Sequence, residues 1–300
     1  MTTLADTFVN SVAVVTGAGS GIGFALATAA VRHDCKVVLA DIREEPLQQA
    51  AEKLRQMNGD VLAVQADVAS CPSVQALADA AFAQYGKVNL LFNNAGVFAS
   101  GLTWEVSLEE YDWVIGVNQK SVIHGIKCFV PRMIAQGDPC HVINTASGAG
   151  ITANPGFCSY SMTKHAVVSL SETLWLDLQS QGITHIGVTC VMPGVVQSKI
   201  MFPEKTGPQA LQDELQSRLF NRTLGAVEGM MRSAVEAGLP AEAAAEMVFD
   251  AIQRKALYVL PNFTDDGSQA MARAIAVGRA AGENAYPAIL DGLLKGIGLR

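Results

Sequence analysis

The sequence predicts an α/β fold in which helices cover both faces of a doubly wound parallel sheet. Short apolar runs rich in β-branched residues, such as Val12–Thr16 and Lys36–Ala40, alternate with longer stretches of helical periodicity. These runs are apolar at nearly every position, which is typical of strands buried on both faces. Parallel neighbours require a helical crossover, which is expected to be right-handed. The alternation therefore indicates one sheet with helices on each side.

The expected elements follow one another without a linker or an internal repeat. The strands are Val12–Thr16, Lys36–Ala40, Asp60–Gln65, Val88–Phe92, His141–Ala146, Ile186–Met192 and Leu257–Leu260. The helices are Ile22–His33, Glu44–Met57, Pro72–Tyr85, Ser107–Ile134, Ser159–Gln181 and Pro240–Arg254. A chain of 300 residues permits two domains, but the continuous alternation predicts a single domain over residues 1–300. Within it we expect a core at 10–195, an insertion at 196–238 and a helical tail at 265–300.

Composition excludes several classes of protein. The 21 Lys and Arg against 28 Asp and Glu give a net charge of −7 without a basic cluster, which argues against a nucleic-acid or membrane partner. A mean hydropathy of +0.25 is too apolar for disorder, yet charged, Gly or Pro residues interrupt every stretch that could span a bilayer. The first residues lack the pattern of a secretory signal, so we expect a cytoplasmic protein with reduced, mostly buried cysteines.

The first strand leads directly into a glycine-rich turn at the start of a helix. The turn reads Thr-Gly-x-x-x-Gly-x-Gly over residues 16–23. Glycines allow a tight turn and close approach to a pyrophosphate, and the helix N-terminus offers free N–H groups. The turn therefore predicts a dinucleotide site, as in Rossmann-type folds. Its candidate binding residues are Gly17, Ser20, Gly21, Ile22 and Gly23.

Acidic residues follow the next two strands. Asp41 ends the second strand, where a carboxylate can accept hydrogen bonds from the adenosine ribose and repel a 2′-phosphate. This position favours NAD over NADP, although Arg43 could bind such a phosphate. Asp67, with Val68 beside it, follows the third strand and is expected to contact the adenine.

Further motifs occur in the order and spacing of the short-chain dehydrogenase/reductase superfamily, which this chain resembles in its compact, single-domain form. They are the glycine turn, Asn93-Asn94-Ala95-Gly96 after the fourth strand, Ser147, Tyr160-x-x-x-Lys164, and Pro193-Gly194 after the sixth strand. The resemblance covers residues 10 to about 200. It implies an NAD(P)-dependent oxidoreductase that interconverts a secondary alcohol and a ketone by hydride transfer at nicotinamide C4. It also implies cofactor contacts from Asn94, Pro193 and Gly194.

The residues themselves support that chemistry. Tyr160 and Lys164 lie one helical turn apart and share a helix face. An ammonium, together with an oxidised nicotinamide, would favour the phenolate of a tyrosine whose pKa is ordinarily about 10. Ser147, at the end of the fifth strand, can donate a hydrogen bond to the substrate oxygen. The resemblance implies that Tyr160 is the general acid/base, that Lys164 also binds the nicotinamide ribose, and that Asn118 holds a water linking Lys164 to solvent.

Other interpretations remain open from the sequence. The chain could be a dinucleotide-sensing regulator without turnover, or a non-redox lyase or isomerase on the same scaffold. The five histidines show no metal-ligand spacing, so we expect no metal. The family resemblance implies a homodimer or homotetramer that packs through helices 107–134 and 159–181.

The substrate is expected to be a small molecule with a bulky hydrophobic or aromatic group. The pocket should be formed by Gly148–Phe157, Met192–Val196 and the 196–238 insertion acting as a lid. The insertion carries the large apolar residues Met201, Phe202, Leu215, Leu219, Phe220, Met230 and Met231. These could instead only pack an additional helix. The segment Phe129–Gly137 and the last strand resemble the bacterial branch that includes Cα-dehydrogenases of lignin-type aryl ethers.

Overall fold

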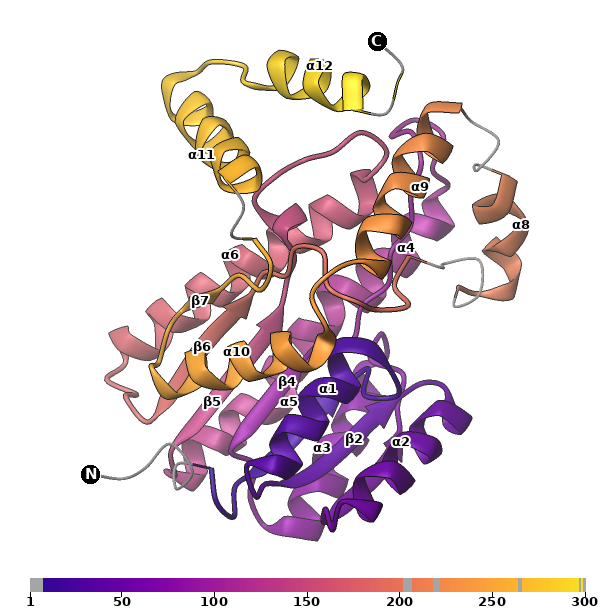
Figure 1. Cartoon of the computed structure of the whole chain (residues 1–300). Coiled ribbons are helices and arrows are strands. Elements are labelled where there is room, and N and C mark those ends of the chain that lie inside the picture. The colour runs from indigo at the N-terminus through magenta and orange to yellow at the C-terminus, as the bar shows by residue number, and fades with distance from the viewer. Residues whose placement is uncertain (1–7, 202–206, 218–221, 264–265, 297, 299–300) are drawn as a thin grey trace.

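The computed structural model describes residues 8–201, 207–217, 222–263, 266–296 and 298 (Figure 1). Seven strands form one sheet in the order β3-β2-β1-β4-β5-β6-β7, and neighbouring strands are parallel. Their bounds are β1 Val12–Thr16, β2 Lys36–Asp41, β3 Val61–Gln65, β4 Leu90–Asn93, β5 Cys140–Thr145, β6 Ile186–Val191 and β7 Tyr258–Val259. The predicted doubly wound α/β fold is confirmed.

Helices cover both faces of the sheet (Figure 1). One core lies under α1 (Gly21–Arg32), α2 (Glu44–Gln56) and α10 (Ala241–Gln253), and the other lies under α3 (Cys71–Tyr85), α5 (Ser121–Gln136) and α6 (Cys158–Ser180). Alternate residues of β1 enter the two cores: Ala13 and Val15 enter the first, Val12 and Val14 the second. A strand buried on both faces must be apolar throughout, as its sequence is.

The strand order creates a switch point between β1 and β4. The chain first builds outward through β2 and β3, then returns to pair β4 with the free side of β1. The loops that leave the carboxyl ends of β1 and β4 therefore diverge to opposite faces of the sheet. In open α/β sheets ligands bind in the crevice outside these ends. The polar residues singled out above lie at this edge.

The prediction of one continuous helix over Ser107–Ile134 is wrong in detail. It consists of α4 (Leu108–Ile115), a π-helical segment η2 (Gly116–Lys120) and α5. Asn118 lies in the π segment, and its side-chain amide hydrogen-bonds the main chain of Val97 rather than facing solvent. Widened π turns of this kind often occur at functional sites.

The remaining helices lie at the end of the molecule beyond the carboxyl edge of the sheet (Figure 1). The insertion contains α8 (Gln209–Ser217) and α9 (Arg222–Glu236), and the tail contains α11 (Asp266–Ala281) and α12 (Tyr286–Gly296). A short 3-10 turn, η3 (Gly148–Gly150), follows β5. Phe202, Leu219 and Phe220, which the sequence assigns to the lid, lie outside the described residues. Among the helices that are described, none combines the length and apolarity needed to cross a bilayer.

Candidate active site

The glycine turn after β1 packs closely against the loop after β4. Gly17 has a φ of +66°, and a Cβ there would lie 2.8 Å from Ala95 Cα. A Cβ on Gly23 would lie 2.2 Å from the carbonyl oxygen of Gly17, so both positions require glycine. Ser20 precedes α1 without its side chain capping the helix, and Ile22 packs partly against the core. The first N–H groups of α1 therefore remain available to an anion.

Thr16 and Asn94 hold the turn to the neighbouring strand. The Thr16 hydroxyl accepts hydrogen bonds from the main-chain N–H groups of Asn94 (2.9 Å) and Ala95 (3.1 Å). The Asn94 amide donates to Thr16 O at 2.9 Å, and its oxygen accepts from Thr145 Oγ1 at 3.3 Å. Asn94 thus joins β1, β4 and β5 at the switch point. The sequence motif begins with Thr16 but gave it no role, because its hydrogen bonds join it to residues 78 and 79 positions away.

Asp41 is buried beside the turn and already accepts four hydrogen bonds. Its Oδ2 accepts from Gly19 N at 3.0 Å and from an Arg43 guanidinium nitrogen at 3.2 Å. Its Oδ1 accepts from Arg43 N and Arg43 Nε, both at 3.0 Å. Four bonds fill the acceptor positions of a carboxylate. A ribose hydroxyl can therefore bind Asp41 only if the Arg43 side chain moves.

Cationic side chains border the outer side of the turn. A cavity of about 300 Å³ there is lined by residues of the turn and α2, including Arg43, Lys53 and Lys199. Further along the edge, Asp67 is exposed and accepts from Ala69 N at 2.9 Å, while Val68 beside it is buried. The polar, positively charged lining of the cavity beside Arg43, Lys53 and Lys199 suits phosphate groups.

Ser147, Tyr160 and Lys164 converge at the carboxyl end of β5. The Ser147 side chain hydrogen-bonds the Tyr160 phenol, and its Oγ also accepts from Ala149 N at 3.2 Å. Lys164 is only 2% exposed, and its ammonium donates to Thr145 O at 2.9 Å. The Lys164 Nζ lies 5.7 Å from the centre of the Tyr160 ring. The i, i+4 spacing on α6 therefore does bring the two side chains to one site.

Asn118 completes this group from the π segment. Its amide accepts from Val97 N at 2.8 Å and donates to Val97 O at 2.9 Å and to Thr163 Oγ1 at 3.2 Å. A Cβ built on Gly96 would lie 3.4 Å from both Asn118 Oδ1 and Lys164 Nζ. The two polar groups thus border the same small space behind the tyrosine.

Burial dominates the electrostatics of the tyrosine. It raises the pKa of Tyr160, and the hydrogen bond from Ser147 partly opposes that rise. Burial also lowers the pKa of Lys164 to about 8, against an ordinary value of 10.5, with Cys190 acting in the opposite direction. The pKa of Tyr160 therefore lies above its ordinary value. A positive group close to the phenol would favour its charged form.

Pro193 and Gly194 lie where the loop after β6 meets the neighbouring segments. The carbonyl of Pro193 accepts from Gly148 N at 2.8 Å, and Gly194 N donates to Pro261 O at 2.9 Å. A Cβ on Gly194 would lie 2.3 Å from Asn262 O. The Pro-Gly pair thus holds together the loops after β5, β6 and β7, close to Ser147.

An apolar cluster covers Tyr160 on the side away from the sheet. It contains Phe98, whose ring packs edge-on to Tyr160 at 5.2 Å, and side chains from the loop after β6 and from α9. The cluster members are Phe98, Ala149, Phe157, Tyr160, Met201, Val227 and Val235, with Val195, Ile200, Met231 and Leu293 packed against them. Leu293 comes from α12, a contribution that the sequence did not suggest.

A buried polar contact anchors α9 over this cluster. Ser100 Oγ donates to Glu228 Oε2 at 2.6 Å, and Arg232 donates to Glu228 Oε1 at 2.7 Å. Glu228 is 3% exposed. Side chains of α9 therefore pack in the cluster that contains Tyr160, and this carboxylate attaches α9 to the loop after β4. Only the three-dimensional structure brings Ser100 and Glu228 together, because they are 128 positions apart.

The described residues contain no group of three His, Cys, Asp or Glu side chains suited to hold a metal ion. The site is thus built from hydroxyl, amide and ammonium groups around a glycine turn. Such a combination is suited to binding a dinucleotide and moving a proton at a tyrosine.

Comparison with known proteins shows the family. Residues 11–208 match the model of the short chain dehydrogenase family, and the chain belongs to this family. A short-chain dehydrogenase/reductase from Burkholderia phymatum, solved in complex with NAD, is 40% identical with a TM-score of 0.86, and the match covers 93% of this chain and 97% of that one.

Curated relatives are named dehydrogenases. A C alpha-dehydrogenase from Sphingobium sp. strain SYK-6 is 31% identical over 85% of this chain and 81% of its own length. A 1-deoxy-11-beta-hydroxypentalenate dehydrogenase from Streptomyces avermitilis is 39% identical over 63% of this chain and 69% of its own length. The chain is therefore an oxidoreductase of the short-chain dehydrogenase family.

Proposed function

We propose that this protein interconverts a secondary alcohol and a ketone that carry a bulky hydrophobic or aromatic group, with NAD as the favoured cofactor. The observation that carries the proposal is the convergence of Ser147, Tyr160 and Lys164 under an apolar cover. Relatives named C alpha-dehydrogenase and 1-deoxy-11-beta-hydroxypentalenate dehydrogenase support the dehydrogenase class, and the apolar cover of Tyr160 supports the substrate class.

The residues of the glycine turn fit a dinucleotide. Gly17 and Gly23 let the turn pack tightly on itself and on the loop after β4, and the N-terminus of α1 offers N–H groups beside it. Gly17, Ser20, Gly21, Ile22 and Gly23 would hold the phosphates, Asp41 the adenosine ribose, and Asp67 with Val68 the adenine. Asn94, Lys164, Pro193 and Gly194 would hold the nicotinamide side. When bound, the dinucleotide supplies the hydride acceptor or donor.

The side chains then manage the proton and the charge. In oxidation, Tyr160 accepts the proton of the substrate hydroxyl, and in reduction it returns a proton to the same oxygen. Ser147 donates a hydrogen bond to that oxygen as negative charge develops on it. Lys164, held by Thr145 O, supplies positive charge close to Tyr160. Asn118 and Lys164 border a space in which a water would connect the site to solvent.

The test measures reduced-nicotinamide absorbance with a panel of aryl and alkyl secondary alcohols. We expect Tyr160→Phe to lose at least 99% of kcat, since general acid/base catalysis contributes about 10²–10⁴-fold. The variant should still bind NAD, because a phenylalanine fills the same space. Full activity in Tyr160→Phe would refute the mechanism. NAD binding by a wild-type protein that turns over no alcohol or ketone of the panel would instead favour the dinucleotide sensor.

The preference for NAD has its own test at Asp41 and Arg43. Asp41→Ala should weaken NAD binding and reduce discrimination against NADP, because it removes the acceptor that a 2′-phosphate would face. Arg43→Ala should strengthen NAD binding, since it frees the Asp41 oxygens. Tighter binding of NADP than of NAD, abolished by Arg43→Ala, would reverse the cofactor assignment.

Self-association is also part of the proposal. Met162, Trp175 and Leu176 on α6 are large apolar side chains that are 45%, 36% and 59% exposed. A homodimer or homotetramer would cover them, as the family's α5 and α6 interfaces do. Sedimentation that gives a monomer at micromolar concentration would exclude this part.

A further inference from the structure

The terminal helix α12 lies over a hollow rather than on packed protein. None of its residues is buried, although Tyr286, Ile289, Leu290 and Leu293 form one apolar side of the helix. These side chains face a chamber of about 540 Å³, which we call the tail chamber. Side chains over a void lose the dispersion contacts that ordinarily hold an apolar helix in place. An occupant of the chamber would restore those contacts.

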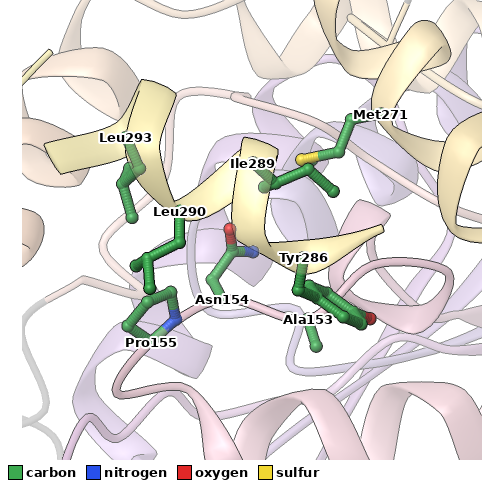
Figure 2. Close-up of a pocket in the computed structure, with 8 residues that line it drawn as sticks. All are labelled: Ala153, Asn154, Pro155, Met271, Tyr286, Ile289, Leu290 and Leu293. Carbon is green, nitrogen blue, oxygen red and sulfur yellow. The ribbon is translucent and has the colours of Figure 1, made fainter. Parts of the chain in front are cut away.

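The floor of the tail chamber is the loop that joins the two catalytic elements. Ala153, Asn154 and Pro155 form it, between Ser147 and Tyr160 in the chain. Figure 2 shows Leu290 above Pro155, and Met271 of α11 beside Ile289. The chamber thus has two helices as walls and the substrate-side loop as its floor. Its volume lies within the range of about 300–1,000 Å³ that small-molecule sites occupy.

One end of the chamber meets the cover of the catalytic tyrosine. Leu293 lines the chamber and also packs against the cluster that contains Phe98, Phe157 and Tyr160. The cover of Tyr160 and the chamber thus share an apolar side chain, and an elongated molecule with its reacting carbon at Tyr160 would meet apolar groups in the direction of α12. The chamber is nearly all hydrocarbon, and among the described residues its lining includes no charged side chain. The amide of Asn154 and the hydroxyl of Tyr286 are its polar side-chain groups.

We propose that the tail chamber binds the distal hydrocarbon portion of the substrate, and that it selects uncharged alcohols and ketones with an extended alkyl or aryl group. This inference rests on the proposed function and adds a specificity site whose walls, α11 and α12, come after the residues 11–208 that match the family. A charged terminus would lose its hydration against this apolar lining. A longer hydrocarbon chain would gain affinity with each buried methylene.

The test is a chain-length series of 2-alkanones from butanone to dodecanone, measured by calorimetric binding and by kcat/KM. Each added methylene should tighten binding by up to about fourfold until the chamber is filled, after which the curve levels off. Leu290→Ser should flatten that slope and weaken decanone binding by roughly fivefold. Because Leu290 is 40% exposed on a helix without buried residues, the substitution leaves the fold intact.

Two further variants separate the possible explanations. Ala153→Leu adds volume to the floor and should shift the level part of the curve to shorter chains. Val277→Ser removes an equally apolar side chain, 67% exposed on α11 and not part of the chamber lining, and should leave the profile unchanged. A profile that does not respond to Leu290→Ser or Ala153→Leu would overturn the proposal.

The binding measurement also distinguishes failure of the chamber from failure of the proposed reaction. Chain-length-dependent binding without turnover of any alkanone would support the chamber and refute the reaction. Turnover without chain-length dependence would refute the chamber alone. If Leu290→Ser instead dissociates an oligomer and leaves alkanone binding unchanged, the apolar face of α12 serves a second copy of the chain and the proposal is wrong.

Discussion

The burial of Lys164 should make the stability of the protein depend on pH in a defined window. Burial lowers the pKa of Lys164 from 10.5 to about 8, so between these values the unfolded chain binds the proton and the folded chain releases it. Stability rises with pH wherever the unfolded state holds more protons. The folded state is therefore penalised most at neutral pH and gains stability as the pH rises through this window.

The size of the effect follows from the two pKa values. Below about pH 8 both states are protonated, and the shift corresponds to a penalty of about 3 kcal/mol. At about pH 9.5 the folded state has lost its proton, and the remaining penalty is about 1 kcal/mol. The difference, about 2 kcal/mol, is a substantial part of the stability of a typical domain. The variant Lys164→Met removes the titrating group and keeps a long side chain at the same position.

The assay is urea unfolding of the wild type and Lys164→Met at about pH 7 and pH 9.5. Subtracting the two proteins cancels the titration of groups remote from Lys164, and the difference reports Lys164 together with Cys190, since each shifts the pKa of the other. We expect the wild type to gain about 2 kcal/mol relative to the variant between the two pH values. A difference in unfolding free energy that stays constant with pH would show that the ammonium is not desolvated in the folded protein, and would refute the reasoning.

Two further predictions concern the core and the lid. Burial, and to a lesser extent Lys255, lowers the pKa of His141 from 6.5 to about 4. The free energy of unfolding should therefore fall as the pH drops below 6.5, and unfolding experiments at about pH 5 should show a loss of about 2 kcal/mol. His141→Gln should remove this loss, and an equal loss in the variant would contradict the assignment. Glu228→Gln weakens the contacts with Ser100 and Arg232 and should destabilise α9 by about 1–3 kcal/mol. We expect faster amide hydrogen exchange in α9, and a rise in KM that is larger than the fall in kcat. Glu236→Gln, at an exposed position of the same helix, is the matched control, and equal exchange in both variants would argue against a special role for Glu228.

The elements and motifs that the sequence predicted are those that local physics determines. The continuous apolar runs of β1 and β2 follow from burial on both faces, and the glycine turn follows from backbone geometry at Gly17 and Gly23. The shared face of Tyr160 and Lys164 follows from the period of one helix. In each case the signal lies within a few residues of the chain, so the sequence alone can express it.

The features that the sequence did not predict depend on contacts between distant segments. The π segment forms where Asn118 bonds the main chain of Val97, 21 positions away, and no pattern in the helix itself indicates it. The hydrogen bonds from Arg43 to the Asp41 carboxylate depend on the rotamer of the Arg43 side chain. A spacing of two residues permits this rotamer but does not require it. The raised pKa of Tyr160 depends on how fully the loops bury it.

The candidate catalytic residues that the sequence predicted and the later helix contacts that it did not predict lie in different parts of the chain. Ser147, Tyr160, Lys164 and Asn118 all lie within the region that matches the family, whereas α9 and α12, which bring Glu228 and Leu293 to the site, come after residue 208. The proposed reaction chemistry therefore rests on residues within the part of the chain that matches the family. The shape of the substrate space does not, because its outer walls are built by the later helices. A relative informs the substrate of this protein only to the extent that it aligns with α9 and α12 as well as with the sheet.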